Sequence, residues 1–160
     1  MTVTNKRVEI KEPFNLSDMV KIEQAIALSK YAFYKPYPVR KINSLYFDTV
    51  SYDALEESIE GNSLRKKTRL RWYDGQKINL NLETKYKNNM MNKKKIVSQG
   101  TFNSFVQLKV FLKKNFLVLN NGASQPMEPI LKIRYLRNYF LSKCENYRAT
   151  VDTAITVSDI

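Results

Sequence analysis

The fold is decided by residues 66–87, which read KKTRLRWYDGQKINLNLETKYK. Within 66–73 a basic residue occupies every second position, at Lys67, Arg69 and Arg71. After an Asp-Gly pair, 78–87 alternates again, with a polar series at Asn79, Asn81, Glu83, Lys85 and Lys87. Period-two alternation is typical of strands with one buried and one wet face, and Asp-Gly is typical of a hairpin turn. The stretch predicts a hairpin with one apolar face and one charged face.

The flanking segments extend this hairpin into a mostly antiparallel domain. Alternating patterns predict further strands at 7–11, 42–48, 130–137 and 147–153. Helices are predicted at 52–59, at about 103–115, and in a segment that carries Met19, Ile22, Ala25 and Ile26 and is capped by Asn15 or Ser17. Segments 31–40, 88–95 and 120–126 are polar or hold prolines and are predicted to lack regular structure. We expect one α+β domain over residues 1–160, an antiparallel sheet with a few peripheral helices.

The composition restricts the chemistry. Lys and Arg outnumber Asp and Glu 27 to 15, which gives a formal net charge of +12 and indicates an anionic partner: nucleic acid, a membrane surface or a phosphate compound. The absence of histidine excludes a Ser-His-Asp triad and most zinc sites. Cys144 is the single cysteine, which favours a reducing, cytoplasmic setting, and no apolar run approaches the roughly 20 residues of a membrane span.

The charged strand faces are the most informative feature. Same-face neighbours on a strand lie roughly 6.6 Å apart, about twice the phosphorus spacing of a phosphoanhydride chain, so three cations on one face could line several phosphates. A sheet with one wet face also carries Lys and Arg without any ligand, and this alternative stays open for each single strand. Recurrence at 7–11, 67–71 and 79–87 favours phosphate binding. Glu9 and Glu83 lie among these bases, where phosphates and carboxylates together could hold Mg²⁺ or Mn²⁺.

Six short motifs follow one another along the chain: E-x-K at 9–11, S-L-Y-F-D-T at 44–49, K-x-R-x-R-W-Y at 67–73, L-E-x-K at 82–85, Y-x-R at 135–137 and R-x-x-x-D-T at 148–153. In this order they resemble the VTC-type polyphosphate polymerase domain of the triphosphate tunnel metalloenzyme (CYTH-like) superfamily, from Arg7 to about Ile155. The resemblance implies an antiparallel β-barrel tunnel lined with charged side chains, a divalent metal (Mn²⁺ or Mg²⁺), and ATP or another nucleoside triphosphate with polyphosphate as ligands.

The resemblance also implies roles for single residues. It implies that the phosphates are bound during transfer by six catalytic residues: Lys11, Arg69, Arg71, Lys85, Arg137 and Arg148. It places further phosphate contacts on Lys67, Lys87, Lys93, Lys95 and Tyr135, and metal ligation on Glu9 and Glu83.

Three departures from the family pattern produce expectations of their own. Arg7 stands where the superfamily's fuller motif begins with a glutamate. Tyr135 and Arg137 are in phase with Leu131 and Ile133, so we expect a bulge or twist within 131–137. The family continues beyond the Asp152 motif with strands that supply a metal-binding glutamate and lysines, so we expect those C-terminal strands to be missing and the tunnel to be incomplete.

The function expected from the resemblance is transfer of the terminal phosphoryl group of ATP to polyphosphate. A triphosphatase on the same scaffold is the nearest alternative, because only the acceptor differs. A non-catalytic polyanion binder is a second alternative, and the missing strands favour it. Nucleic-acid binding is a third, but the sequence lacks a recognised module and its aromatic residues fall mainly on apolar faces.

Overall fold

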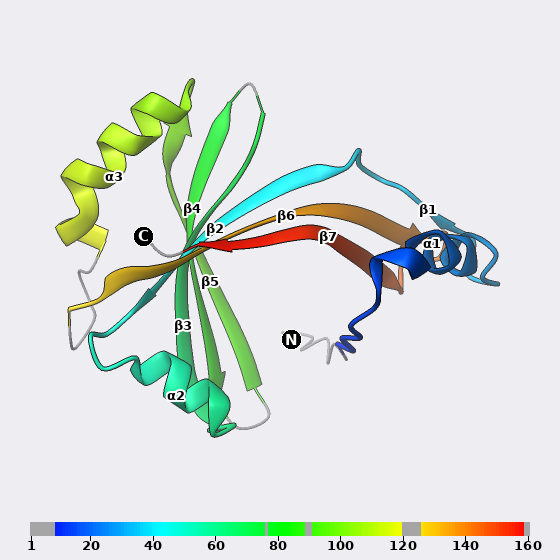
Figure 1. Ribbon diagram of the computed structural model, residues 1–160, viewed down its shortest axis with the longest axis horizontal. Helices are drawn as coiled ribbons and strands as arrows, with labels where there is room; N and C mark the ends of the chain where they lie inside the picture. The colour runs from blue at the N-terminus through cyan, green and yellow to red at the C-terminus, as the bar shows by residue number, and fades with distance from the viewer. Residues whose placement is uncertain (1–8, 76, 89–90, 120–125, 159–160) are drawn as a thin grey trace, which may run out of the picture. The chain divides into compact units, whose positions relative to one another are not determined.

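The computed structural model describes residues 9–75, 77–88, 91–119 and 126–158, with side chains at all of these except 91–92 and 115–119. Their elements are, in order, η1 (Leu16–Asp18), α1 (Met19–Ala27), β1 (Phe33–Tyr34), β2 (Arg40–Asp48), α2 (Asp53–Ile59), β3 (Leu64–Tyr73), β4 (Ile78–Asn88), β5 (Met91–Phe102), α3 (Phe105–Leu119), β6 (Glu128–Ser142) and β7 (Arg148–Ser158). Figure 1 shows them along the chain.

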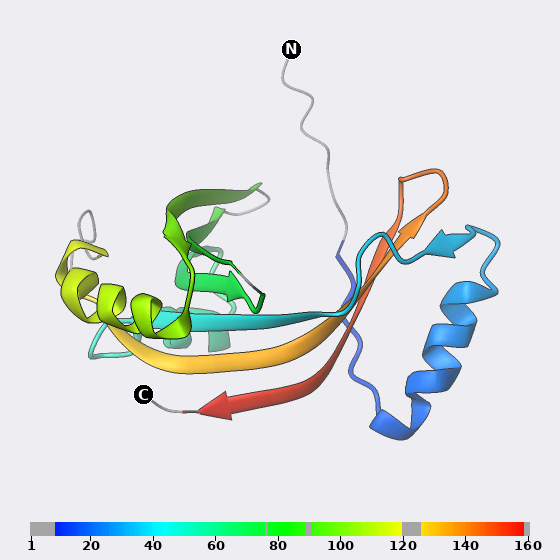
Figure 2. The same ribbon diagram turned by 90° about the horizontal axis from the view of Figure 1, so that it is seen from above.

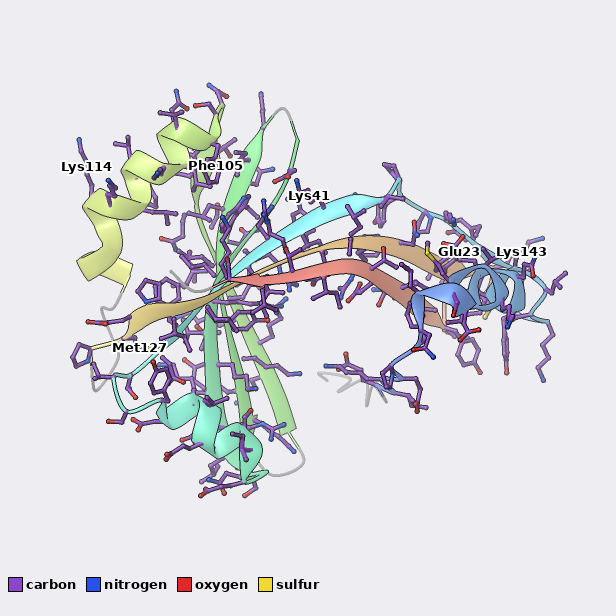
Figure 3. The ribbon with its side chains drawn as sticks, in the orientation of Figure 1. Glu23, Lys41, Phe105, Lys114, Met127 and Lys143 are labelled. Carbon is purple, nitrogen blue, oxygen red and sulfur yellow. The ribbon has the colours of Figure 1, made fainter. Side chains whose placement is uncertain are left out.

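The chain divides into two compact units. The first holds the described residues up to Pro36 together with Phe140–Ala149, and the second holds Tyr37–Tyr139 together with the chain from Thr150 onward. In the first unit, β1 pairs antiparallel with the last residues of β6, Phe33 lying opposite Ser142. Glu23 of α1, labelled in Figure 3, forms a salt bridge with Lys35, whose Nζ lies 3.3 Å from Glu23 Oε2.

The second unit is an antiparallel sheet that curls into a half-barrel. Its strands follow the order β6-β2-β3-β4-β5, and β7 pairs with β6. Figures 1 and 2 show the curl, with β3, β4 and β5 crossing the direction of β2 and β6. The expected α+β tunnel fold is therefore confirmed in the form of a curled antiparallel sheet with three α-helices among the described residues.

The core of the second unit lies between the sheet and α3. Its buried members come from β2, β3, β4 and α3: Phe47, Leu70, Trp72, Ile78, Leu80 and Leu108. Leu70 and Trp72 are apolar positions of the alternating segment 66–73. The prediction that this side of the hairpin is buried is confirmed, because it is the side against which α3 packs.

Most predicted elements are present, and three predictions were wrong. Residues 9–11 form no strand, because no described strand pairs with them; residues 7–8 lie outside the described part. Segment 31–40 contains the short β1. The lysine-rich part of 88–95 belongs to β5, which ends the strand order at one edge of the sheet. Lysine is depleted in strands generally but suits an exposed edge, so composition hid this strand.

The loop predicted at 120–126 falls almost wholly outside the described residues. Among the helices that the structure describes, none has the length and apolar character needed to cross a bilayer.

Candidate functional site

The side of the sheet opposite the α3 core carries the charged residues, and we call it the polar face. The ladder sets Tyr46 of β2 opposite Arg69 of β3, and Arg69 opposite Glu83 of β4. Ser44 lies opposite Arg71 in the same way. Because side chains alternate along each strand, this registry places all five on one side, away from the core.

Arg69 is clamped between an acid and a phenol. Its Nε and Nη2 donate to Glu83 Oε2 at 2.8 and 2.7 Å, and its Nη1 donates to Tyr46 Oη at 2.8 Å. Burial alone would lower the pKa of Arg69, but Tyr46 and Glu83 outweigh it and raise that pKa. The guanidinium is therefore permanently charged and fixed in orientation.

Glu83 is shared by three cations. Besides Arg69, Lys94 of β5 donates to its Oε1 at 2.8 Å, and Arg71 Nη1 lies 3.8 Å from its Oε2. Burial would raise the pKa of the Glu83 carboxyl, but the hydrogen bonds from Lys94 and Arg69 hold it below the usual glutamate value. We call these four residues the Glu83 cluster. One carboxylate faces three cations in it, so positive charge remains uncompensated.

Arg71 carries most of that uncompensated charge. Its side chain is 9% exposed, and its two hydrogen bonds go to neutral groups: Nε donates to Ser44 Oγ at 3.2 Å and Nη2 to Tyr135 Oη at 3.1 Å. Burial raises the pKa of Tyr135 against the opposing effect of Arg71, so the phenol stays neutral. The nearest carboxylate, Glu83, lies 3.8 Å away and is already bonded to Arg69 and Lys94, so this desolvated guanidinium favours an incoming anion.

Arg137 has a carboxylate of its own. It makes a two-bond fork with Asp152 of β7, from Nε to Oδ1 at 2.5 Å and from Nη2 to Oδ2 at 2.6 Å. Burial would lower the pKa of Arg137, but Asp152 outweighs it and the pKa is raised. The pair links β6 to β7 and is neutral as a whole.

A row of lysines crosses the polar face beside the cluster. Lys67 lies directly opposite Lys85, and Lys85 directly opposite Lys94. The next cross-strand pair on the same face is again basic, Arg65 opposite Lys87. Like charges placed opposite one another destabilise a sheet, so two such pairs in succession indicate a ligand of opposite charge.

The structure brings together most of the predicted site residues on this face: Lys67, Arg69, Arg71, Glu83, Lys85, Lys87, Tyr135 and Arg137. Sequence reasoning did not assign the groups that hold them, namely Ser44, Tyr46, Lys94 and Asp152. Tyr46 and Ser44 share one side of the alternating segment 42–48, and that parity was the available signal.

Lys93 and Lys95 are the exception within this unit. They lie opposite Tyr86 and Thr84, which places them on the other side of β5, while Lys94 takes the polar face. The ladder between β4 and β5 shifts by one residue between Leu80 and Asn81, and Gln99 is the extra residue. This bulge, next to the positive φ of Gly100, changes the side of the sheet on which the residues beyond it lie, so Phe102 packs against the core although Lys94, an even number of residues before it, lies on the polar face.

The bulge expected within 131–137 is also placed differently. The ladder with β2 runs without a shift from Leu131 to Arg137, and the irregularity lies before it, where Ile130 is skipped. Leu131 and Ile133 therefore share the polar face with Tyr135, and both are half-buried.

The remaining predicted residues belong to the first unit. Glu9 and Lys11 lie in its irregular N-terminal segment, both exposed, with Lys11 Nζ 3.9 Å from Glu9 Oε1. Arg148 begins β7 and is exposed. Their roles stay predictions.

The polar face offers few protein ligands for a divalent cation. Among the described residues, no three His, Cys, Asp or Glu side chains are placed so that they could hold a metal ion together. Both oxygens of Glu83 and both of Asp152 already accept bonds from cations. The protein side chains alone therefore do not fit a metal centre, and a metal here would depend on phosphate oxygens for its ligands.

In a comparison with known protein families, the model of the VTC domain matches residues 6–160. No curated protein matches the chain. The match spans nearly the whole length and therefore establishes the family, whose domain has the triphosphate tunnel (CYTH-like) fold. It suggests a function related to polyphosphate.

Proposed function

This chain belongs to the VTC domain family, and on that premise we propose that it binds a phosphate chain on the polar face and extends it with the terminal phosphoryl group of ATP. The observation that carries the proposal is Arg71: its side chain is 9% exposed, and among the described residues it donates hydrogen bonds to the neutral groups Ser44 Oγ and Tyr135 Oη. A phosphate oxygen would give it an anionic hydrogen-bond acceptor, which Glu83 at 3.8 Å does not provide, in the planar geometry that a guanidinium prefers.

The proposed reaction needs no protein nucleophile. A terminal oxygen of the acceptor polyphosphate attacks the γ-phosphorus of ATP, a new P–O bond forms, and the bond to the β-phosphate oxygen breaks to release ADP. Phosphoryl transfer depends mainly on alignment and charge stabilisation. The Glu83 cluster and the row Lys67–Lys85 would supply both, because their strands hold them at fixed spacing.

The other predicted residues take supporting roles in this proposal. Arg137 is oriented by Asp152 and would contact phosphate through its remaining N–H groups. Lys87 would extend the row toward the end of the hairpin. Lys11, Arg148 and Glu9 remain assigned to phosphate and metal by the family resemblance, and Lys93 and Lys95 would act only on parts of a ligand that leave the polar face.

Mn²⁺ or Mg²⁺ is part of the proposal as an ion carried by the phosphates. When bound, it would neutralise phosphate charge. Glu83 lies nearest the cations of the cluster, and its bonds to Arg69 and Lys94 suit an orienting role better than metal ligation. The cytoplasm, where ATP is abundant, is the proposed setting.

Two alternatives have support from the site. Triphosphate hydrolysis is favoured by the half-barrel, because an open sheet admits water as the acceptor. Polyanion binding without catalysis is favoured by Glu83 and Asp152, which are both engaged by cations and leave no spare carboxylate in the cluster.

Phosphorus NMR of the purified chain with ATP and Mn²⁺ tests these against one another. A growing polyphosphate resonance together with ADP would establish the polymerase. Orthophosphate as the sole product would establish the triphosphatase. Intact ATP combined with binding of tripolyphosphate would leave the binder, and absence of both reaction and binding would overturn the proposal.

Replacing Arg71 should identify the polar face as the binding surface. We expect Arg71→Gln to weaken tripolyphosphate binding about 10- to 100-fold, because one buried charge-assisted contact contributes about 1.5–3 kcal/mol. Isothermal titration measures this. Lys114→Gln is the matched control, since it also removes one positive charge but from the exposed side of α3 (Figure 3). Equal affinities for both variants would contradict the proposed site.

A further inference from the structure

A second basic cavity lies where the β3–β4 hairpin strands end beside α2. It has a volume of about 470 Å³, within the ~300–1,000 Å³ of typical small-ligand pockets. Its charged and aromatic lining comes from α2, β3, β4 and β5: Glu57, Arg65, Lys66, Tyr86, Lys87 and Lys93. We call it the α2 pocket. Figure 1 shows α2 beside this end of the three strands.

The α2 pocket is strongly positive. Four of its lining residues are cations and one, Glu57, is acidic. Within the described part of the chain, none of these four cations forms a salt bridge. Lys66 Nζ lies 5.8 Å from the centre of the Tyr86 ring, which holds the ammonium over an aromatic face. Four unneutralised cations around one hollow indicate a polyanionic ligand.

The cation row of the polar face ends at this pocket. Arg65 and Lys87 line the pocket from the polar face, whereas Lys66, Tyr86 and Lys93 lie on the other side of the strands, so a chain that enters the pocket from the row turns round the strand ends. From Arg71 the basic residues of β3 run through Arg69 and Lys67 to Arg65, which already lines the pocket. At about 3.3 Å per residue this distance is roughly 20 Å. A triphosphate spans only about 6 Å, taking a phosphorus spacing of roughly half the ~6.6 Å between same-face neighbours. A chain of about seven phosphates is the shortest that could touch both ends.

We propose that the α2 pocket is a second phosphate site, which holds the distal units of a phosphate chain whose other end lies in the Glu83 cluster. The inference rests on the proposed function and adds to it a dependence on chain length. Triphosphate and ATP occupy the Glu83 cluster alone, whereas chains of about seven units or more engage both sites. The pocket thereby favours retention of long chains over short ones.

Two variants of opposite sign test the pocket. Lys66→Glu reverses one of its cations, and we expect it to weaken binding of a polyphosphate of about ten units by roughly three- to tenfold, the usual scale of one partly exposed charge contact. Glu57→Lys adds a cation and should tighten the same binding. Neither should change tripolyphosphate affinity by more than about twofold, because Lys66 lies five residues from Arg71 along β3, roughly 16 Å, and charges at that range are screened at 0.15 M salt.

The matched controls carry the same charge changes outside the pocket. Glu56→Lys lies on α2 next to Glu57 but does not line the cavity, and Lys114→Glu lies on α3. A longer phosphate chain binds more tightly to any single site, because it can occupy that site in many alternative positions along its length. The decisive quantity is therefore the ratio of long-chain to tripolyphosphate affinity, compared between each variant and wild type by titration calorimetry.

Opposite shifts of this ratio in Lys66→Glu and Glu57→Lys, absent in the controls, would support the pocket. A ratio unchanged in both pocket variants would overturn it and leave the proposed function intact. Equal loss of both ligands in Lys66→Glu would also overturn it, because the two sites would then be one. Failure of wild type to bind either ligand would instead remove the proposed function, and the inference with it.

Discussion

Glu83 accepts bonds from Arg69 and Lys94 at once and lies 3.8 Å from Arg71. Such a carboxylate prevents three crowded cations from repelling one another while their ligand is away. Tyr46 and Tyr135 complete the arrangement, since each phenol accepts a bond from one arginine. The tyrosines of the Y-F-D-T and Y-x-R motifs thus orient the two guanidinium groups that the K-x-R-x-R motif supplies.

The lowered pKa of Glu83 predicts a pH dependence of stability. Because the folded-state pKa lies below the usual value of about 4.3, the ionised carboxylate stabilises the fold fully above that value and loses its effect as the pH falls through the folded-state pKa. Glu83→Gln should therefore lower the free energy of unfolding at pH 7 by about 1–3 kcal/mol. The difference from wild type should shrink below about pH 4.

Urea unfolding at pH 7 and at about pH 3 measures both quantities. Glu12→Gln is the control, because it removes the same charge from a residue that is exposed and lies in no helix or strand. A destabilisation that is equal at the two pH values would show that the ionised form of Glu83 does not hold the cluster.

Sequence alternation alone could select Lys67, Arg69, Arg71, Lys85 and Glu83, because β3 and β4 pair without a bulge from Leu64 to Arg71. It could not select Lys94 in place of Lys93 and Lys95. That choice depends on the register of β5 against β4, in which Lys85 pairs with Lys94, and alternation within β5 alone does not give that register. Parity along a strand is a local property, whereas parity between strands depends on every bulge in the ladder.

At the level of elements, Asp48 joins β2 to α2. Its side chain is buried at the end of the strand, where Oδ1 accepts from the backbone N–H of Thr49 and of Ala54 at 2.9 Å each, and Oδ2 from that of Leu55 at 3.0 Å. Two of these donors are N–H groups of the first helical turn, which lack partners within the helix. The carboxylate therefore fixes where α2 begins and how it lies against β3.

Asp48→Ala should lower the free energy of unfolding by about 1–2 kcal/mol, because three backbone donors lose their buried acceptor. Asp48→Asn should recover part of this loss, since its amide oxygen still accepts. Thermal and urea unfolding measure the series, with Asp53→Ala, a half-buried acid in the first turn of the same helix, as the comparison. Similar losses at both positions would show that helix-end charge, rather than the hydrogen bonds of Asp48, stabilises α2.

The limits of sequence reasoning are visible at this level too. The hairpin 66–87 and the helix α3 after it followed from periodicity, because each has an apolar side that packs in the core. The segment 9–11 also alternates yet forms no strand, since a strand exists only where another offers its edge. β5 was missed for the opposite reason: its lysines mask a segment whose backbone pairs along all of β4.

For the molecule as a whole, the net charge of +12 would attract any polyanion, so specificity must come from how the charges are arranged. On an exposed basic surface, affinity for a polyanion arises mainly from counterion release and falls steeply with salt. Arg71 and Glu83 are instead largely buried, where hydrogen bonds and low solvent access reduce screening. Two classes of polyanion should therefore respond differently to ionic strength.

We predict that raising the salt from about 0.1 to 0.2 M weakens duplex DNA binding roughly tenfold or more, as expected for a ligand that touches several exposed lysines. Tripolyphosphate held by Arg69 and Arg71 should weaken only about threefold over the same range, because its main contacts are shielded from solvent ions. Fluorescence competition titrations of wild type at four salt concentrations give both slopes. Arg71→Gln sharpens the test: loss of the shielded contact should bring the tripolyphosphate slope closer to that of DNA. Equal salt dependence of DNA and tripolyphosphate binding in wild type would mean that phosphate binds to the exposed basic surface in general. The Glu83 cluster would then not be the binding site.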